Sequence, residues 1–552
     1  MTPGPAHPSL AGRAGGPILL LLLAAAIAQT MAELVPMLLR DDAYSGDAQQ
    51  HVWWLYRFID PALFPNDLIA TYYSLPAFST PGYQVVMRAL IGWIDPQHAA
   101  ELLAIGLAVV AIVLTAVLGF GIGKKTGAAA ALAVFILCQC ERLLDGGYPR
   151  TFGLVLLLAG MIALHRRRWA ALGAVLAVSP LFYAPTVLNL APAAALVFAF
   201  DVYRSRRLPD GIVPFVLLGG VGVVIIGSIY LKPAPAEIGK WYTYNEGRKL
   251  AEMRPGGRTA FFRSWPTYYF KSPVSGIGLT PWQAGFAAAA LLGLTIWRPA
   301  TVPPAAWALL AGALLVYAAA HVLLFKLYLP GRYTSYALPV FAMMCMAGVA
   351  REIKKLVIKA ADQHRAWPRR IITVSSCVFA VGCVVVAAGS ARAAMRSPGY
   401  GGITAGSEDV LTFLRTLPTD TLIAAHPEDA NPIPLRSRRS VLASTETSIA
   451  FHKGYYGTIR ERLNATFDML YTTDWPALDA MAAAHGVDVF VLDRTRLNVP
   501  DDRPYFRPFQ TTNVARIAAG KTAGFAMLSP PPNRVLMESG DWAVLRVGRG
   551  KP

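Results

Sequence analysis

Residues 16–58 read GPILLLLLAAAIAQTMAELVPMLLRDDAYSGDAQQHVWWLYRF. An apolar helix of about 20 residues crosses a bilayer, so we expect residues 16–39 to form a first membrane span. A signal peptide is the alternative, because Ala25–Ala28 resembles a cleavage region. The apolar character continues to Leu39, which favours an uncleaved span. Aspartates and then aromatic residues follow directly, so we expect these side chains to lie at the membrane surface.

The composition of the whole chain is also typical of a membrane protein. Of 552 residues, 55% are hydrophobic and 15% are charged, whereas soluble domains carry about 25% charged residues. We predict a polytopic α-helical protein with about eleven spans. The ten candidates after the first are 99–123, 127–141, 150–164, 169–184, 186–200, 211–231, 283–297, 303–327, 333–350 and 371–391.

Lysines and arginines predict the orientation of these spans. Basic residues concentrate in cytoplasmic loops. Five basic segments follow the second, fourth, sixth, eighth and tenth predicted spans, so all five can lie in the cytoplasm. This places the N-terminus in the cytoplasm and the C-terminal tail outside, as in a bacterial inner membrane with a periplasmic tail. We therefore attribute the net charge of +18 to membrane topology rather than to nucleic-acid binding. We expect membrane lipids as partners and no nucleic acid. The basic segments are 124–125, 166–168, 204–207, 298 and 351–370.

The chain divides into a transmembrane part, residues 1–391, and an extracytoplasmic α/β domain, residues 392–552. Two large outer loops interrupt the first part: an acidic loop, 40–98, and a basic loop, 232–282. All five cysteines lie in apolar segments, so the tail has no disulfide framework. Periodicity in the tail predicts helices at 408–417 and 475–485 and strands at 421–425, 487–492 and 542–547.

Three carboxylates of the acidic loop are catalytic candidates. Asp41 and Asp42 follow the first span, and Asp47 precedes Trp53–Phe58, which we expect to form a helix in the lipid headgroup layer. A carboxylate there can act as a general base or hold a divalent metal. The alternative is that Asp41 and Asp42 are solvated charges and that Asp47 only caps the helix.

These features resemble the GT-C superfamily of membrane glycosyltransferases. Gly46-Asp47 with Trp53–Phe58 is similar to the acidic element of that superfamily, and Ser79–Tyr83 is similar to its proline turn. The resemblance implies a polyprenyl-phosphate-linked sugar as donor. It also implies an aspartate that acts on the acceptor, although Asp47 is followed by Ala48 and the acidic pair lies at Asp41-Asp42.

The resemblance further implies a second carboxylate between the third and fourth spans, and Asp145 is the candidate. A Gly/Pro turn with an exposed ion pair is the alternative. We expect the donor phosphate to be bound by Arg332, Arg150, Lys240 and Arg248. For Arg332 the alternative is contact with ordinary headgroups, and for the basic loop it is adhesion to anionic lipid.

The leading hypothesis is an inverting glycosyltransferase that acts on a glycan, lipid or protein acceptor at the outer membrane face. The first alternative is a lipid or glycan transporter, which should carry charged or helix-breaking residues inside its spans. Ala, Val and Leu dominate those segments here. The second alternative is a non-catalytic glycan-assembly protein with the same fold. No cofactor is implied with certainty, and a divalent metal remains open.

Overall fold

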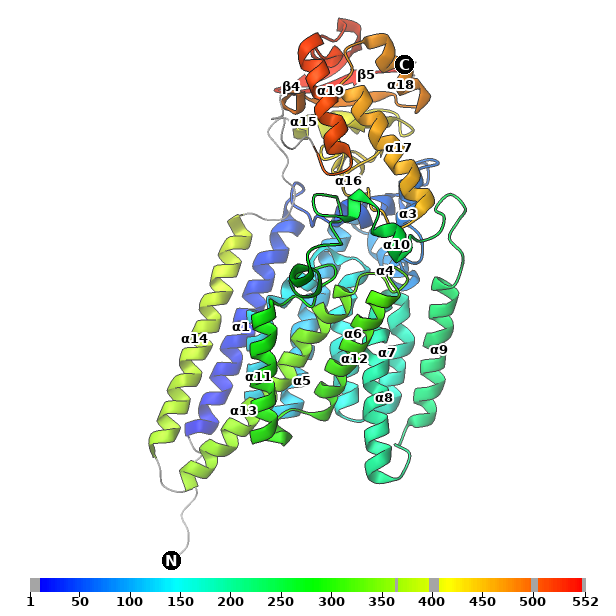
Figure 1. The fold of residues 1–552 in the computed structure, drawn as a ribbon. Helices are drawn as coiled ribbons and strands as arrows, with labels where there is room; N and C mark the ends of the chain where they lie inside the picture. Colours follow the sequence, from blue (N-terminus) through cyan, green and yellow to red (C-terminus); the bar gives the residue numbers. More distant parts are fainter. Residues whose placement is uncertain (1–9, 363–365, 397–406, 498–504, 549–552) are drawn as a thin grey trace, which may run out of the picture.

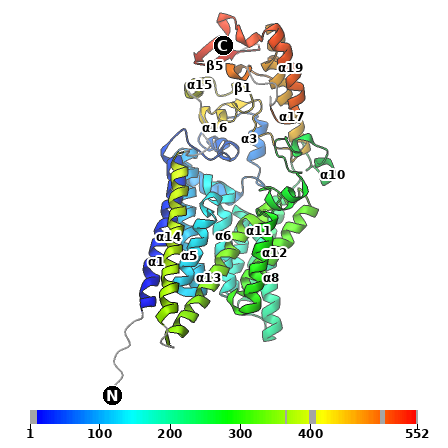
Figure 2. The same cartoon turned by 60° about the vertical axis from the view of Figure 1, so that its left-hand side comes forward.

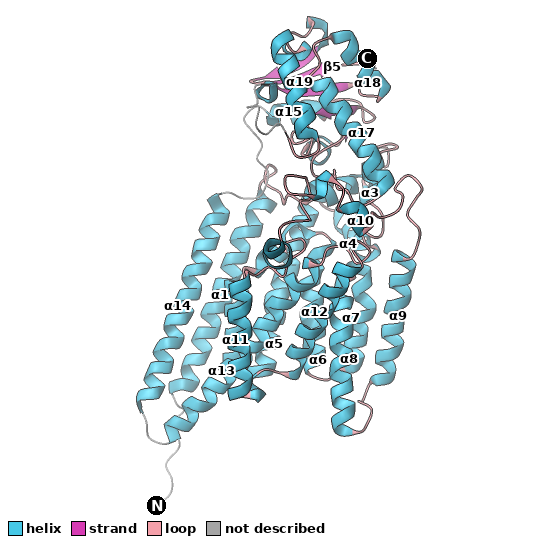
Figure 3. Ribbon diagram, viewed as in Figure 1, coloured by secondary structure: helices cyan, strands magenta, loops and turns pink. Residues whose placement is uncertain are grey.

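The computed structural model describes residues 10–362, 366–396, 407–497 and 505–548. A bundle of long helices carries a small mixed domain on one end (Figure 1). The strands are confined to that domain (Figure 3). Segments that connect the bundle helices fill the layer between the bundle and the domain, and this layer positions the site described below.

Within the described residues, seven helices are long and apolar enough to cross a membrane. They are α1 (Leu10–Leu39), α5 (Pro96–Leu137), α8 (Pro185–Ser205), α9 (Ile212–Tyr230), α12 (Pro304–Val322), α13 (Gly331–Asp362) and α14 (Ala366–Arg396). Three shorter apolar helices accompany them: α6 (Phe152–His165), α7 (Trp169–Phe182) and α11 (Pro281–Trp297). The chain is thus an integral membrane protein.

The predicted segment 99–123 and most of 127–141 belong to α5, which ends at Leu137 and is interrupted at Gly123 and Lys124. Lys124 has a φ of 56°, a left-handed value that breaks helical geometry. A Cβ on Gly119 would lie 2.4 Å from the carbonyl oxygen of Gly127. The two halves of α5 therefore pack directly against each other, at a distance that only glycine permits.

Several predicted basic segments lie at the end of the bundle opposite the mixed domain. The α8–α9 turn and the ends of α11 and α13 lie there (Figure 1). Two contacts join further segments to this end: Arg166 approaches Gly121, and Arg351 donates a hydrogen bond to the carbonyl of Ala300 at 2.5 Å. Residues 363–365 of the last basic segment lie outside the described residues.

The acidic loop folds into short helices between α1 and α5. They are α2 (Ala48–His51), the 3₁₀ helix η1 (Trp53–Phe58), α3 (Leu68–Tyr73) and α4 (Pro81–Ile91). Trp53, Trp54 and Tyr56 are at most 4% exposed, so the expectation that they lie in the lipid headgroups is wrong. They pack inside the protein because the mixed domain covers the loop.

The basic loop also packs against the tail. It contains α10 (Tyr244–Gly247), the 3₁₀ helix η5 (Ala251–Met253) and the π-helix η6 (Thr267–Lys271). The backbone N–H of Tyr242 donates to the carbonyl of Phe451 at 2.9 Å, and Lys453 pairs with Glu246 at 2.6 Å. Much of this loop therefore serves to dock the tail.

The described part of the tail contains a five-stranded sheet in the order β2-β1-β3-β5-β4. The β1–β2 and β1–β3 pairs are parallel, and β3–β5 and β5–β4 are antiparallel. The strands are β1 (Leu422–Ala425), β2 (Ser440–Val441), β3 (Val489–Asp493), β4 (Val535–Ser539) and β5 (Trp542–Arg546). The helices are α15 (Ser407–Leu414), α16 (Ile433–Ser437), α17 (Lys453–Leu470), α18 (Trp475–Ala484) and α19 (Phe509–Ala523). All three predicted strands and both predicted helices are present.

One hydrophobic core joins the acidic loop to the tail, and a second core fills the bundle. In the first core the rings of Tyr72 and Tyr455 stack with centroids 3.7 Å apart, and the Tyr72 hydroxyl lies 2.9 Å from His452 Nδ1. The tail therefore rests on the acidic loop as part of the same folded layer (Figure 2).

Candidate functional site

A cavity of about 280 Å³ lies beneath the acidic loop, where the bundle meets the outer layer. Charged and polar side chains line one part of it: Asp47, His51, Tyr148, Arg150, Lys326 and Arg332. Apolar residues of α8 and α9 line another part, among them Leu188 and Ile226. A cavity with this division fits a ligand that carries a charged group on an apolar chain.

Two carboxylates meet at one arginine on the wall of this cavity. Arg150 Nη1 lies 2.5 Å from Asp47 Oδ2, and Arg150 Nη2 lies 3.2 Å from Asp145 Oδ1. Asp145 also accepts a hydrogen bond from Ser45 at 3.1 Å, and Ser45 in turn contacts the Tyr148 hydroxyl. The structure therefore brings the predicted second carboxylate beside Asp47, although about 100 residues separate the two in the sequence.

Local structure accounts for these positions. Asp47 precedes α2 but makes no capping hydrogen bond to it, so its carboxylate is free to pair with Arg150. Asp145 begins a short 3₁₀ turn, Asp145–Gly147. Gly147 has a φ of +59°, and a Cβ on it would lie 1.8 Å from the carbonyl oxygen of Ala100. Only glycine allows this turn to approach α5 so closely.

The surroundings shift the pKa values of the two carboxylates in opposite directions. Burial alone would raise the pKa of Asp47, but the positive charge of Arg150, helped by Arg332 and Arg258, holds that pKa below its usual value. Burial raises the pKa of Asp145, and the attraction of Arg150 does not cancel that effect. Asp47 is thus the more acidic of the two carboxylates, and it is also the one that lines the cavity.

Arg332 supplies a cation without a carboxylate partner. Among the described residues it forms no ion pair, whereas Arg150 forms two. It follows Gly331, where a Cβ would lie 2.7 Å from the carbonyl oxygen of Pro273. The first turn of α13 is therefore held against the basic loop, and Arg332 lines the cavity beneath. An unpaired guanidinium in such a place is a strong anion-binding group.

Sequence reasoning missed His51 and Lys326, which also line the cavity. His51 lies four residues after Asp47, a spacing that places both on one face of a helix, so this signal was available. Burial lowers the pKa of His51 to about 4, so it is neutral near pH 7. For Lys326, an exposed residue just before Arg332 in the chain, the sequence gives no comparable signal.

Four other predicted residues do not line the cavity. Asp41 is 74% exposed beside His98, and Asp42 pairs with Arg40 at 2.6 Å. Lys240 and Arg248 are exposed on the basic loop, and Arg248 lies over the ring of Tyr244. The geometry thus favours Asp47 over Asp41 and Asp42, and Arg332 with Arg150 over the two residues of the basic loop. The roles of all these residues stay predictions.

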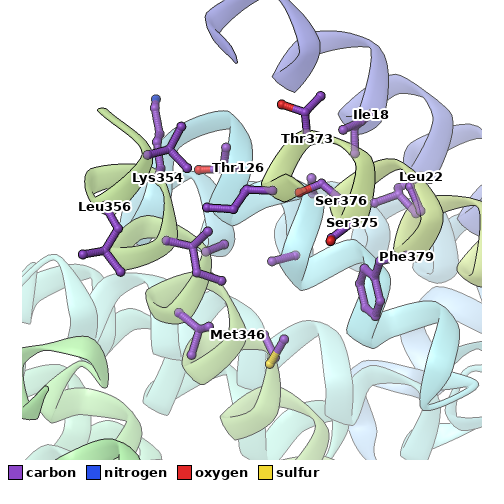
Figure 4. Close-up of a pocket in the computed structure, with 18 residues that line it drawn as sticks. Ile18, Leu22, Thr126, Met346, Lys354, Leu356, Thr373, Ser375, Ser376 and Phe379 are labelled. Atoms are coloured by element: carbon purple, nitrogen blue, oxygen red, sulfur yellow. The ribbon is translucent and has the colours of Figure 1, made fainter. Parts of the chain in front are cut away.

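A larger cavity of about 480 Å³ lies at the opposite end of the bundle, between α1, α5, α13 and α14. Its polar groups include Lys354, Thr373, Ser375 and Ser376, which stand among aliphatic side chains (Figure 4). None of the described residues that line it is acidic. The described residues of its lining therefore supply no carboxylate that could act as a general base.

The described residues contain no group of three or more His, Cys, Asp or Glu side chains arranged to hold a metal ion. The two carboxylates nearest to each other in the site, Asp47 and Asp145, are both occupied by Arg150.

No protein-family model matches the sequence, and no curated protein matches it. Among solved structures, ArnT from Cupriavidus metallidurans bound to undecaprenyl phosphate matches with a TM-score of 0.47 and 13% identity, over 97% of this chain and 99% of that one. The archaeal oligosaccharyltransferase AglB from Archaeoglobus fulgidus, in complex with an inhibitory peptide and a dolichol-phosphate, matches with a TM-score of 0.51 and 13% identity. That match covers 86% of this chain and 69% of AglB.

The chain therefore shares the fold of AglB, which is a GT-C enzyme. The expectation drawn from the acidic loop is thereby confirmed at the level of fold. The GT-C fold places the cavity with Asp47, Arg150 and Arg332 between the membrane bundle and the outer domain.

Proposed function

We propose that this protein is a membrane glycosyltransferase that moves a sugar from a polyprenyl-phosphate carrier to an acceptor, with inversion at the anomeric carbon. The observation that carries the proposal is the cavity of about 280 Å³ that combines an ionised carboxylate, Asp47, with an unpaired guanidinium, Arg332, above an apolar wall. The solved complex of AglB with dolichol-phosphate supports a lipid phosphate as the anion.

The side chains divide the reaction between them. Arg332 and Lys326 bind the carrier phosphate, and the apolar wall from α8 and α9 receives the polyprenyl chain. Asp47 accepts the proton of the acceptor hydroxyl while the oxygen of that hydroxyl attacks the anomeric carbon. The bond from that carbon to the phosphate oxygen breaks, and the carrier phosphate leaves with the electron pair. Its added negative charge is stabilised by Arg332.

Arg150 and Asp145 act through Asp47. Arg150 holds the Asp47 carboxylate in place and keeps it ionised, and Asp145 holds the other side of the guanidinium. A single base is enough for one displacement, and one displacement inverts the anomeric centre. His51, neutral and four residues from Asp47, adds a polar group to the same wall without adding charge.

We also propose eleven spans, made up of the seven long helices, the three shorter ones and the second half of α5. With the N-terminus in the cytoplasm, this odd number puts the acidic loop, the basic loop and the tail outside. The basic segments at the opposite end of the bundle support this orientation.

Asparagine substitutions test the proposal. Asp47→Asn keeps the volume and hydrogen-bonding capacity but removes the basicity, so transfer from a polyprenyl-phosphate sugar should fall at least about 10²-fold. Donor binding and the amount of folded protein should change little. Asp42→Asn, which disturbs only an exposed ion pair, should stay within about threefold of the wild type. Turnover is measured with purified protein in nanodiscs.

Two results would contradict the assignment in different ways. Full activity of Asp47→Asn with loss in Asp42→Asn would move the base to the start of the loop. Full activity of both variants would remove the central residue of the mechanism. Movement of intact lipid-linked sugar across the bilayer, without transfer, would instead support the transporter alternative.

A further inference from the structure

A second cavity, of about 330 Å³, lies between the tail and the acidic loop. On the tail side it is bounded by the carboxyl ends of the parallel strands β1 and β3: Asp493 ends β3, and Glu428 and Asp429 follow β1. Loops at the carboxyl ends of parallel strands are the usual place for ligands in α/β domains. On the membrane side it is bounded by residues 44–49.

The short segment 46–51 separates this cavity from the one described above. Gly46 and Gln49 line the tail-side cavity, whereas Asp47 and His51 line the membrane-side cavity. Residues three or four positions apart share a face of a helix, so α2 and the residues before it present one face to each cavity. Gly46 has no side chain, which makes the partition thin next to Asp47.

The tail is held firmly over this partition. Glu446, which lines the tail-side cavity, accepts hydrogen bonds from Gln50 at 2.6 Å and from Arg258 at 2.9 Å. Arg258 also donates to the carbonyl of Thr445 at 2.7 Å. The acidic loop, the basic loop and the tail thus meet at one network, which fixes the tail-side cavity relative to Asp47.

The lining of the cavity combines acceptors with donors. Asp429 and Glu428 accept from Arg496, which is bound to Asp429 through two nitrogens at 3.1 and 2.6 Å. Gln49 and Asn431 add amide groups, and Tyr44 and Trp542 add aromatic surface. Hydroxyl groups both donate and accept, whereas ammonium groups only donate and phosphates only accept. This mixture therefore matches a polyhydroxylated ligand better than a cation or an anion.

We propose that the tail-side cavity binds the acceptor and that the acceptor is a neutral glycan, held next to the segment that carries Asp47. The proposal rests on the proposed function, because it assigns the second substrate of that reaction. Four carboxylates against one arginine make the lining net negative, which disfavours a phosphorylated acceptor. The cavity lies at strand ends rather than along a strand edge, so it lacks the backbone ladder by which extended peptides commonly bind.

The test measures binding of neutral oligosaccharides to the full-length protein in nanodiscs by saturation-transfer NMR. The probes are linear manno- and gluco-oligosaccharides, with a neutral peptide and glycerol phosphate for comparison. Asp493→Asn is the first variant: Asp493 Oδ1 accepts from the backbone N–H and the hydroxyl of Thr495, and the asparagine oxygen keeps that turn. Asn431→Ala is the second.

Asp488→Asn is the matched control. Asp488 precedes β3, at the opposite end of the same sheet, and its carboxylate accepts from the N–H of Leu422 at 3.0 Å. The charge change and the domain are the same, but Asp488 does not line the cavity. We expect at least one oligosaccharide to bind, with affinity at least about fivefold weaker in Asp493→Asn and Asn431→Ala and unchanged in Asp488→Asn.

Asp47→Asn separates this proposal from the proposed function. Oligosaccharide binding should survive in Asp47→Asn, and the failure of transfer in that variant is a separate measurement. The proposal is overturned if no oligosaccharide binds the wild type, if the cavity variants bind as well as the control, or if the peptide or glycerol phosphate competes for the same site. Oligosaccharide binding could weaken in the cavity variants while Asp47→Asn still transfers sugar. That result would keep the glycan site and show that Asp47 is not the base of the proposed transfer.

Discussion

The membrane-side cavity and the basic loop 232–282 both gather cations on the outer side of the bundle, yet they use them differently. In the cavity, Arg332 has no ion-pair partner among the described residues and stands next to an apolar wall. In the loop, Arg258 pairs with Glu446 of the tail, and Arg248 is exposed above a tyrosine ring. Charge content alone therefore does not locate the phosphate site. The partners and burial of each cation do.

The orientation of the membrane bundle is the largest test, because both regions must face the same side. In a cysteine-free background, Ala523→Cys on the tail should be labelled almost completely by a membrane-impermeant maleimide added to intact cells. Ser205→Cys, exposed in the α8–α9 turn, should be labelled only after permeabilisation. The reverse labelling pattern would put both the cavity and the loop on the cytoplasmic side and would contradict the proposed orientation.

Arginine substitutions compare the two regions directly. Arg332→Ala should weaken donor binding about 10- to 100-fold, since a hydrogen bond to a charged group contributes roughly 1.5–3 kcal/mol. Arg332→Lys should recover part of the loss, because lysine keeps the charge but not the bidentate geometry. Arg248→Ala should stay within about twofold. Equal losses in Arg332→Ala and Arg248→Ala, measured by titration with a polyprenyl-phosphate sugar, would return the site to the basic loop.

The pH profile sharpens the role of Arg150. Its charge holds the pKa of Asp47 below the usual value, so the ionised base persists well into the acid range. Arg150→Gln removes that charge, and the acidic limb of kcat/KM should move to higher pH. Arg258→Gln is the comparison from the basic loop, with a smaller move in the same direction, because Arg258 makes a minor contribution. An unchanged limb in Arg150→Gln would show that Asp47 does not limit the rate in acid.

His51 gives the smallest expected effect. Its pKa is lowered to about 4 in the folded protein from about 6.5, so the unfolded chain binds the proton more readily between these values. Stability should therefore rise as pH rises from about 4 to about 6.5 and level off above that range. Melting temperatures of His51→Gln should depend less steeply on pH in this window than those of the wild type.

Local sequence patterns predicted the helices and strands better than they predicted what packs around those elements. Most of the predicted apolar segments lie in helices, and the strands at 421–425 and 487–492 appear as expected, because the patterns that predict helices and strands are short-range properties. The prediction for Trp53–Phe58 failed in a specific way. A buried aromatic helix and an interfacial one share the same pattern, and only the packing of the tail over the acidic loop distinguishes them.

The sequence by itself determined that this is a helical membrane protein, which residues of the outer loops carry charge, and that its plan resembles the GT-C enzymes. Tertiary structure alone decided which charges act together. Asp47 pairs with Arg150 from about 100 residues earlier in the chain, whereas Asp145 and Arg150 are local neighbours, and no local pattern encodes the first of these contacts. The same long-range packing left Asp41 and Asp42 in solvent and placed α2 between two cavities, because burial and pairing depend on the whole fold rather than on neighbouring residues.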